Sequence, residues 1–187
     1  MRLNEKTIDR TVIYNGSIID LEVHDVELPD GSTSKRELVF HHGAVAVCAI
    51  TPENEVLLVK QFRKPADQPL LEIPAGKLEK GEDRLEKGED RKEAAIRELQ
   101  EETGYIASDL QFVTNMYGSP GFSSEKLSIY FTDQLTVGET NLDDDEFVEL
   151  HKVPLSQIDS LLKDNKIEDA KTIIALQHLL LNYNHSK

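Results

Sequence analysis

Residues 97–105 read RELQEETGY, and three of the five positions from 98 to 102 are glutamates. On an α-helix, Glu98, Glu101 and Glu102 stand at i, i+3 and i+4, so their carboxylates share one face about one turn long. Such a cluster repels itself unless cations neutralise it, and Mg²⁺ typically takes one or two carboxylates together with phosphate and water oxygens. A solvated acidic helix face is the competing interpretation of the three glutamates taken alone.

The residues around this stretch favour a helix from about residue 90 to residue 103. Asp90 can cap the first turn with its side chain, and Glu93 follows three residues later, as is typical of a helix start. Gly104 can adopt the left-handed conformation that ends many helices. The helix is therefore expected to begin and end where it holds the three carboxylates.

The rest of the chain predicts an α/β fold. The segment 51–54, TPEN, is typical of a hairpin turn between two apolar runs. Strands interspersed with a few helices indicate a mixed sheet between helical layers, and the helix nearest the C-terminus is expected only to pack. The expected strands are 44–50, 55–61, 70–73, 110–117, 126–133 and 147–153, and the other expected helices are 155–163 and 168–182.

The N-terminal residues predict a separate small β appendage. Residues 11–28 alternate imperfectly between apolar and polar, and PDGS at 29–32 is a turn sequence that leads to a second strand at 36–40. We therefore expect an antiparallel appendage over residues 1–42 and a single catalytic domain over residues 43–187.

Composition narrows the class of protein. With 35 acidic against 21 basic residues, the net charge is −14, which disfavours nucleic acid polymers and anionic membranes as partners. The same acidity suits an enzyme that binds a phosphorylated ligand through metal ions. The single cysteine, Cys48, lies in an apolar run and is expected to be a buried hydrophobic residue. No signal peptide or membrane-spanning run is recognisable, so a cytoplasmic protein is expected.

Together with Glu89, residues 97–104 resemble the signature of the Nudix hydrolases. That signature is a glycine, five residues, a glutamate, seven residues, and then Arg-Glu-aliphatic-any-Glu-Glu-any-Gly-aliphatic, with Tyr105 here in place of the last aliphatic residue. The resemblance implies a Nudix-like α/β/α sandwich. It also implies metal-dependent hydrolysis of a nucleoside diphosphate derivative.

An identical tandem repeat, LEKGEDR at 78–84 and again at 85–91, interrupts this signature. Gly76 is correctly spaced from Glu82 in the first copy, whereas Glu89 in the second copy is correctly spaced from the helix residues that follow. Removing either copy restores the whole signature. We therefore interpret the chain as a Nudix protein with seven residues duplicated inside its signature.

The second copy is expected to cap the helix, with Glu89 orienting Arg97, and the first to bulge as a surface loop. If the helix absorbed the insertion instead, seven residues at about 1.5 Å each would displace the glutamates by roughly 10 Å, which a metal site does not tolerate. A helix running back through Gly88 is the competing arrangement, at a cost of about 1 kcal/mol for the glycine.

The resemblance implies roles for individual residues of the signature. Mg²⁺, with Mn²⁺ as a substitute, is expected to bind Glu98, Glu102 and the main-chain carbonyl of Ala75. Glu101 is expected to assist both metal binding and catalysis, and Arg97 is expected to take part in catalysis. Structural roles are expected for Gly76, Glu89 and Gly104.

A second acidic cluster, DDDE at 143–146, corresponds to a loop that supplies the base or a further metal ligand in similar enzymes. Glu146 is favoured as the base, with Asp144 second. A merely solvated loop is the alternative for these four acids.

Outside the signature, the resemblance narrows to the ADP-ribose pyrophosphatase group. Pro120 lies 15 residues after Tyr105, a position that goes with ADP-ribose preference in this family, although Ser-Pro-Gly is equally an ordinary loop sequence. Arg36 and Arg63 are expected to bind phosphate or the terminal ribose, because a guanidinium forms paired hydrogen bonds to phosphate oxygens. The other expected substrate-side residues are Ser119 and Glu125, and the matching segments are 35–37, 61–63, 71–76 and 117–125.

The expected reaction is attack of water on one phosphorus of ADP-ribose, giving AMP and ribose 5-phosphate. A nucleotide sugar, a dinucleotide or a flavin cofactor is the alternative substrate, and a catalytically silent nucleotide-binding domain is the alternative from a different class. The resemblance also implies a homodimer, in which the strands of residues 11–40 pair with a second subunit and their apolar side chains cover the adenine.

Overall fold

The computed structural model describes residues 3–78, 90–142 and 147–183, and the chain divides into two compact units. The smaller unit consists of Met1–Gly43 and Tyr117–Lys126, and the larger of Ala44–Met116 and Leu127–Lys187. The smaller unit therefore combines the N-terminal residues with a segment from the middle of the chain.

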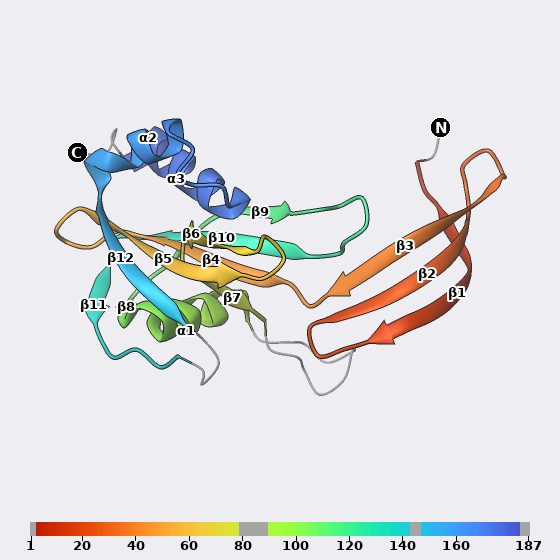
Figure 1. The fold of residues 1–187 in the computed structure, drawn as a ribbon, viewed down its shortest axis with the longest axis horizontal. Coiled ribbons are helices and arrows are strands. Elements are labelled where there is room, and N and C mark those ends of the chain that lie inside the picture. Colours follow the sequence, from red (N-terminus) through yellow and green to blue (C-terminus); the bar gives the residue numbers. More distant parts are fainter. Residues whose placement is uncertain (1–2, 79–89, 143–146, 184–187) are drawn as a thin grey trace. The chain divides into compact units, whose positions relative to one another are not determined.

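The smaller unit is built on a three-stranded antiparallel sheet (Figure 1). The expectation of one strand over residues 11–28 is wrong, because the chain reverses after Asn15 and the Gly16 N–H donates to the Ile19 carbonyl at 3.0 Å. Asn-Gly is a turn dipeptide, so two strands form where one was expected. The expected turn at 29–32 is confirmed. In sheet order the strands are β1 (Lys6–Asn15), β2 (Ile19–Glu27) and β3 (Thr33–His41).

The larger unit is a mixed α/β structure. Its strands are β4 (Ala44–Ala49), β5 (Glu55–Arg63), β6 (Gln68–Glu72), β7 (Ala75–Lys77), β8 (Tyr105–Ala107), β9 (Gln111–Tyr117), β10 (Lys126–Thr132), β11 (Leu135–Val137) and β12 (Val148–Pro154), and its helices are α1 (Arg91–Thr103), α2 (Leu155–Lys163) and α3 (Ala170–Asn182). One sheet has the order β7-β4-β10-β9, a second has the order β12-β5-β6, and β8 pairs with β11. Because β4 runs parallel to β10 and antiparallel to β7, the expected mixed sheet is confirmed.

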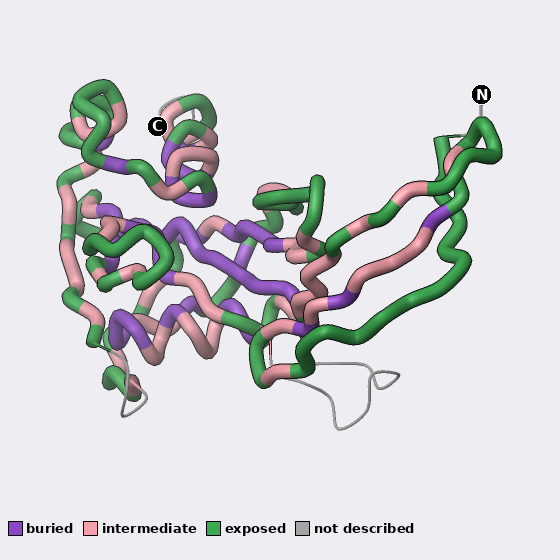
Figure 2. The backbone as a smooth tube through the Cα atoms, turned by 45° about the vertical axis from the view of Figure 1, so that its right-hand side comes forward, coloured by how far each residue is buried: buried purple, intermediate pink, exposed green. Residues whose placement is uncertain are grey.

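Strand β4 fills the cores on both sides of its sheet and is buried along its whole length (Figure 2). Ala46 and Cys48 belong to the core under α2 and α3, whereas Val45 and Val47 belong to the core under α1. Successive side chains of a strand point to opposite faces, which produces this alternation. The helices lie on both sides of the strands (Figure 1), so the expected α/β/α sandwich is confirmed. Burial raises the pKa of the Cys48 thiol to about 12, which agrees with its expected place in the core.

The expected turn at 51–54 forms, but the strands that it joins separate at once. The Thr51 N–H donates to the Glu55 carbonyl at 2.8 Å, and Ile50 and Val56 make a single bridge. Beyond that bridge, β4 pairs with β7 and β10 while β5 pairs with β6 and β12. The turn therefore passes the chain from one sheet to the next, which a local turn sequence does not reveal.

Helix α1 begins and ends where the sequence predicts. The Asp90 side chain accepts hydrogen bonds from the N–H groups of Lys92 and Glu93 at 2.9 and 3.2 Å. At the other end, Gly104 adopts a φ of 73° and its N–H donates to the Gln100 carbonyl at 2.8 Å. Both expected caps are confirmed.

The start of α1 also bears on the tandem repeat. Asp90 has an extended backbone (φ −63°, ψ 132°), so a helix that continues from α1 back through Gly88 is wrong. The second copy supplies the cap, as expected. Residues 79–89, which include Glu82 and Glu89, lie outside the described residues. None of the helices in the described ranges is long and apolar enough to cross a membrane.

Candidate active site

Arg97 forms ion pairs with two of the three carboxylates clustered at residues 98–102 of α1. Its Nη1 lies 3.0 Å from Oε1 of Glu98 and 2.7 Å from Oε2 of Glu101. All three side chains are partly buried. The self-repulsion expected of this helix face is therefore offset by a guanidinium from the same turn.

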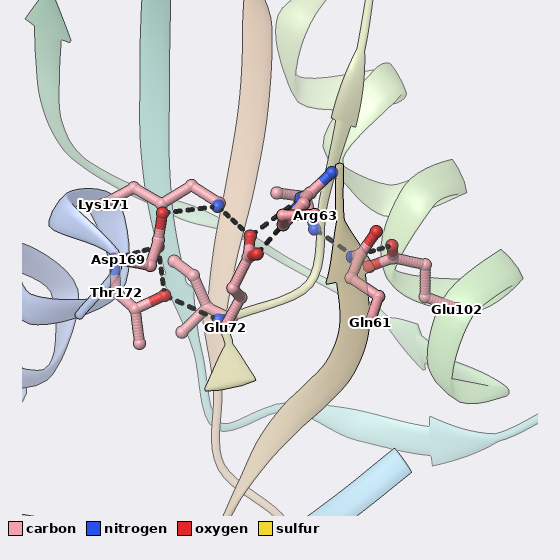
Figure 3. A network of polar contacts seen from close by, with 9 residues as sticks. Gln61, Arg63, Glu72, Glu102, Asp169, Lys171 and Thr172 are labelled. Carbon is pink, nitrogen blue, oxygen red and sulfur yellow. Dashed lines mark hydrogen bonds and ion pairs between the residues drawn. The ribbon is translucent and has the colours of Figure 1, made fainter. Parts of the chain in front are cut away.

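The third carboxylate, Glu102, contacts the strands instead. It is 6% exposed, and its Oε2 accepts the Ala75 N–H at 2.9 Å. Its Oε1 lies 3.4 Å from Nε2 of Gln61 on β5, and Figure 3 shows these two side chains meeting. The sequence predicts a role for the Ala75 carbonyl, whereas the contact shown here is made by its N–H.

Gly76 leaves the space into which the Glu98 carboxyl fits. A Cβ at position 76 would lie 1.8 Å from the Glu98 carboxyl carbon and 2.0 and 2.1 Å from its oxygens. Since Gly76 does not have a positive φ, glycine is needed here for space and not for backbone conformation. The first glycine of the signature thus lies against the first of the three clustered glutamates, Glu98.

These groups suit a metal ion that is shared with a substrate. Among the described residues, no group of three or more His, Cys, Asp or Glu side chains is arranged to hold a metal ion. The described donors are two carboxylates of one helix, Glu98 and Glu102, which contact Gly76 and Ala75 of β7. Magnesium typically uses one or two carboxylates and takes its other ligands from phosphate and water. Two carboxylates of this kind fit a divalent metal ion that takes its other ligands from phosphate and water oxygens.

Arg63 lies at the end of β5 and makes paired hydrogen bonds with Glu72 of β6. Its Nε and Nη2 donate to the two carboxylate oxygens at 2.7 and 2.8 Å (Figure 3). Burial alone would raise the pKa of Glu72, but the hydrogen bonds from Arg63 and the charge of Lys171 more than offset it and leave that pKa below its ordinary value. The hydrogen bond to Glu72 likewise raises the pKa of Arg63. Arg63 is therefore held as a fixed cation.

The first turn of α3 takes part in this network, although the sequence predicts only packing for this helix. Lys171 forms an ion pair with the buried Glu72 carboxylate and a second one with Asp169 at 3.0 Å. The hydroxyl of Thr172 accepts the Ile73 N–H at 2.9 Å. Sequence reasoning missed these residues, together with Gln61 and Glu72, because no local pattern links positions so far apart in the chain.

The loop after β11 is attached to the C-terminal end of α1. The N–H groups of Gly138 and Asn141 donate to the carbonyls of Gly104 and Glu101 at 2.7 and 3.2 Å. This loop leads to the acidic run at 143–146, whose candidates Asp144 and Glu146 lie outside the described residues.

The remaining candidates belong to the smaller unit. Arg36 on β3 makes paired hydrogen bonds with Glu5 at 2.9 and 2.6 Å. The other three candidates lie in the 117–125 segment. Ser119 and Pro120 lie in a turn, in which the Ser119 carbonyl accepts the N–H groups of Phe122 and Ser123. The Glu125 N–H donates to the Ser123 hydroxyl. Residues 122 and 124 pair with Val39 of β3. The 117–125 segment and the strand that carries Arg36 are therefore parts of one structure. 

Comparison with known proteins agrees with this geometry. A family model described as the NUDIX domain matches residues 40–176, well over half of the chain. The chain belongs to the Nudix family. A second model, described as the nucleoside diphosphate sugar hydrolase N-terminal domain, matches residues 5–39 of this Nudix protein. Nudix hydrolases generally need a divalent metal ion, in agreement with the α1 donors.

Several relatives align over nearly the whole Nudix chain. The protein is 49% identical over 181 residues to an ADP-ribose pyrophosphatase of Bacillus subtilis, covering 96% of this chain and 94% of that protein. It is 46% identical over 179 residues to a methanol dehydrogenase activator of Bacillus methanolicus, covering 95% and 93%. A crystal structure of an ADP compounds hydrolase has the same fold, with a TM-score of 0.80 at 22% identity over 99% of this chain and 97% of that one.

Proposed function

We propose that this Nudix protein hydrolyses the diphosphate bond of ADP-ribose, giving AMP and ribose 5-phosphate. The observation that carries the proposal is the turn of α1 in which the Glu98 carboxyl lies against Gly76 and Glu102 accepts the Ala75 N–H. The proposed substrate is supported by the alignment of 96% of the chain with a protein named ADP-ribose pyrophosphatase.

For the metal site, we infer that Glu98, Glu102 and the main-chain carbonyl of Ala75 hold Mg²⁺, or Mn²⁺ in its place, with Glu101 assisting. When bound, the ion polarises the phosphoryl oxygens and lowers the pKa of the attacking water. Arg97 keeps the Glu98 and Glu101 carboxylates in place through its two ion pairs. No covalent bond to the protein is required in this reaction.

A loop carboxylate takes the proton of the attacking water in this proposal. Glu146 is the favoured base and Asp144 the second candidate. The position of the loop before residue 143 supports this choice. Its Gly138 and Asn141 are hydrogen-bonded to the C-terminal end of α1, next to the turn that carries Glu101 and Glu102.

Substrate contacts are proposed for individual residues. Arg63, already fixed by Glu72, is proposed to bind a phosphate or the terminal ribose. The same role is proposed separately for Arg36, which makes paired hydrogen bonds with Glu5. The proposed neighbours of the substrate in the 117–125 segment are Ser119, Pro120 and Glu125.

The N-terminal appendage, residues 1–42, is proposed to form a homodimer. Strand β1 lies at the edge of its sheet, and all ten of its residues are exposed in the single chain. An exposed edge strand with apolar side chains is a site for pairing with another chain. Light scattering at micromolar concentration should give twice the chain mass, and a strictly monomeric protein would contradict the proposal. The exposed apolar residues of β1 are Ile8, Val12, Ile13 and Tyr14.

A panel of diphosphate compounds, each incubated with Mg²⁺ and analysed for phosphate-ester products, tests the proposed activity. ADP-ribose should be cut to AMP and ribose 5-phosphate faster than nucleotide sugars, dinucleotides or flavin cofactors. A nucleotide sugar is the second candidate, because the model matched by residues 5–39 is described by that substrate class. Binding without turnover of any compound would indicate a catalytically silent nucleotide-binding domain.

A further inference from the structure

The segment 73–75, which leads from β6 into β7, is held by two helices. Glu102 of α1 accepts the Ala75 N–H at 2.9 Å, and Thr172 of α3 accepts the Ile73 N–H at the same distance. The sheet holds it as well, since the Val47 N–H donates to the Pro74 carbonyl at 2.9 Å. The C-terminal helix therefore contacts the same short segment as the carboxylate helix does.

The first turn of α3 is itself tightly ordered. Asp169 caps the helix, and its carboxylate accepts from the backbone N–H and the hydroxyl of Thr172 at 2.9 and 2.6 Å. The same carboxylate pairs with Lys171 at 3.0 Å. Thr172 is fully buried and Lys171 is 10% exposed. The Lys171 ammonium is thus held by Asp169 of its own helix as well as by Glu72.

A continuous series of contacts leads from this turn to Arg63 (Figure 3). Lys171 and the Nη2 of Arg63 both donate to Oε2 of Glu72, whose side chain is 1% exposed. The Arg63 side chain, at the other end, is 39% exposed. The buried Lys171 and Glu72 therefore hold Arg63, the most exposed side chain of these three, in place.

We propose that Lys171 is a positioning residue for Arg63, acting through Glu72. Lys171 holds the Glu72 carboxylate, and the carboxylate holds the plane of the Arg63 guanidinium. The inference rests on the proposed function only for the statement that Arg63 then contacts the substrate diphosphate or ribose.

Two effects of Lys171 must be separated, because its charge alone would also attract an anionic substrate. If Lys171 acts through its charge, Lys171→Met still raises KM when Arg63 is absent. If Lys171 acts by positioning Arg63, Lys171→Met has no effect on KM in the Arg63→Ala background. A double-mutant cycle of Lys171→Met and Arg63→Ala distinguishes the two.

The first measurement needs no substrate. In the full-length protein, the NMR signal of the Arg63 Nε–H group, identified by its loss in Arg63→Ala, should exchange slowly with water because it donates to a buried carboxylate. Lys171→Met should speed this exchange by about tenfold or more. The matched control is Lys163→Met, which removes an exposed lysine paired with Asp159 and should leave the signal unchanged. Unchanged exchange in Lys171→Met would overturn the proposal.

The second measurement is the kinetics of ADP-ribose hydrolysis. Arg63→Ala and Lys171→Met should each raise KM by about tenfold with kcat within about twofold, and the double variant should match Arg63→Ala. An equal further rise of KM in the Arg63→Ala background would overturn positioning in favour of a charge effect. If Arg63→Ala leaves KM unchanged, the proposed substrate contact of Arg63 fails, and if the wild type does not cut ADP-ribose, the proposed function fails. In both cases the NMR result still decides whether Lys171 positions Arg63.

Stability is followed in parallel by thermal unfolding, since Lys171 is a buried charge. If Lys171→Met does not fold, Lys171→Gln, which keeps a hydrogen-bond donor, is measured in the same way. A wild-type exchange rate at Arg63 in folded Lys171→Gln, together with a wild-type KM, would equally overturn the proposal.

Discussion

Arg63 and Arg36 make the same contact in two different settings. Each guanidinium donates two hydrogen bonds of 2.6 to 2.9 Å to one carboxylate. The partner of Arg63, Glu72, is 1% exposed and also binds Lys171, whereas the partner of Arg36, Glu5, is 39% exposed. We therefore expect the contribution of an arginine–glutamate pair to stability to depend on the burial of the carboxylate and the number of its partners, and not on hydrogen-bond geometry alone.

The comparison extends to a third carboxylate, Glu102, which is buried like Glu72 but accepts from a backbone N–H. Replacing it with glutamine should lower kcat by at least about a hundredfold, because an amide is a poor substitute for a metal-bound carboxylate. The fold should survive, since an amide oxygen can still accept the Ala75 N–H. Steady-state kinetics and circular dichroism test this. Near-normal turnover would contradict the assignment of Glu102 as a metal ligand.

Glu72→Gln should lower stability in addition to raising KM through the loss of the Arg63 anchor. It leaves Arg63 and Lys171 without their shared carboxylate, and breaking a buried ion pair in this way costs about 3 kcal/mol. Urea unfolding measures the loss of unfolding free energy. A loss no larger than that of a surface substitution would remove the contrast between the two arginine pairs.

Acid should reduce the difference in unfolding free energy between the wild type and Glu72→Gln. The pKa of Glu72 in the folded protein lies below its ordinary value of 4.5. The carboxylate therefore contributes its full stabilisation above that value and loses it as the pH falls through the folded-state pKa. The difference in unfolding free energy between wild type and Glu72→Gln should be constant from about pH 7 to about pH 6 and shrink below about pH 4. A difference that grows on acidification would reverse the assigned sign.

Glu5→Gln is expected to have the smallest effect. An exposed pair is screened by water and salt, so the midpoint of thermal unfolding should not change within error at moderate ionic strength. This variant is the matched control for Glu72→Gln, since both remove the carboxylate from a doubly hydrogen-bonded arginine. Equal destabilisation by the two substitutions would mean that geometry, and not burial, sets the contribution.

Local features of the sequence predicted the structure well where the physics is local. Asp90 and Gly104 cap α1 as expected, because a cap depends on residues within one turn. The turn at Asn15 and Gly16 carries an equally local signal, but the imperfect alternation of residues 11–28 continues across it and masks it. The strands β7, β8 and β11 are three residues each, too short for any periodicity to show.

Contacts between distant residues escaped prediction. Lys171 and Glu72 are 99 residues apart, and so are Thr172 and Ile73. Lys171 lies on the buried face of α3, and the sequence gives no sign of which carboxylate it contacts in the fold. The fold has to bring the two elements together first, so the helix that was expected only to pack also supplies polar contacts at the candidate site.

The close approach of Glu98 to Gly76 has a consequence for how this protein tolerates changes in length. Gly76 is held by pairing of β7 with Val45 of β4, and Glu98 by a helix with its own cap at Asp90. Each anchor is independent of how many residues run between them. Lengthening a connection between fixed ends costs only about 0.6 kcal/mol for each doubling. Insertions in this connection, such as a copied heptapeptide, are therefore expected to change the unfolding free energy little, while a single methyl group at position 76 would displace the Glu98 carboxylate.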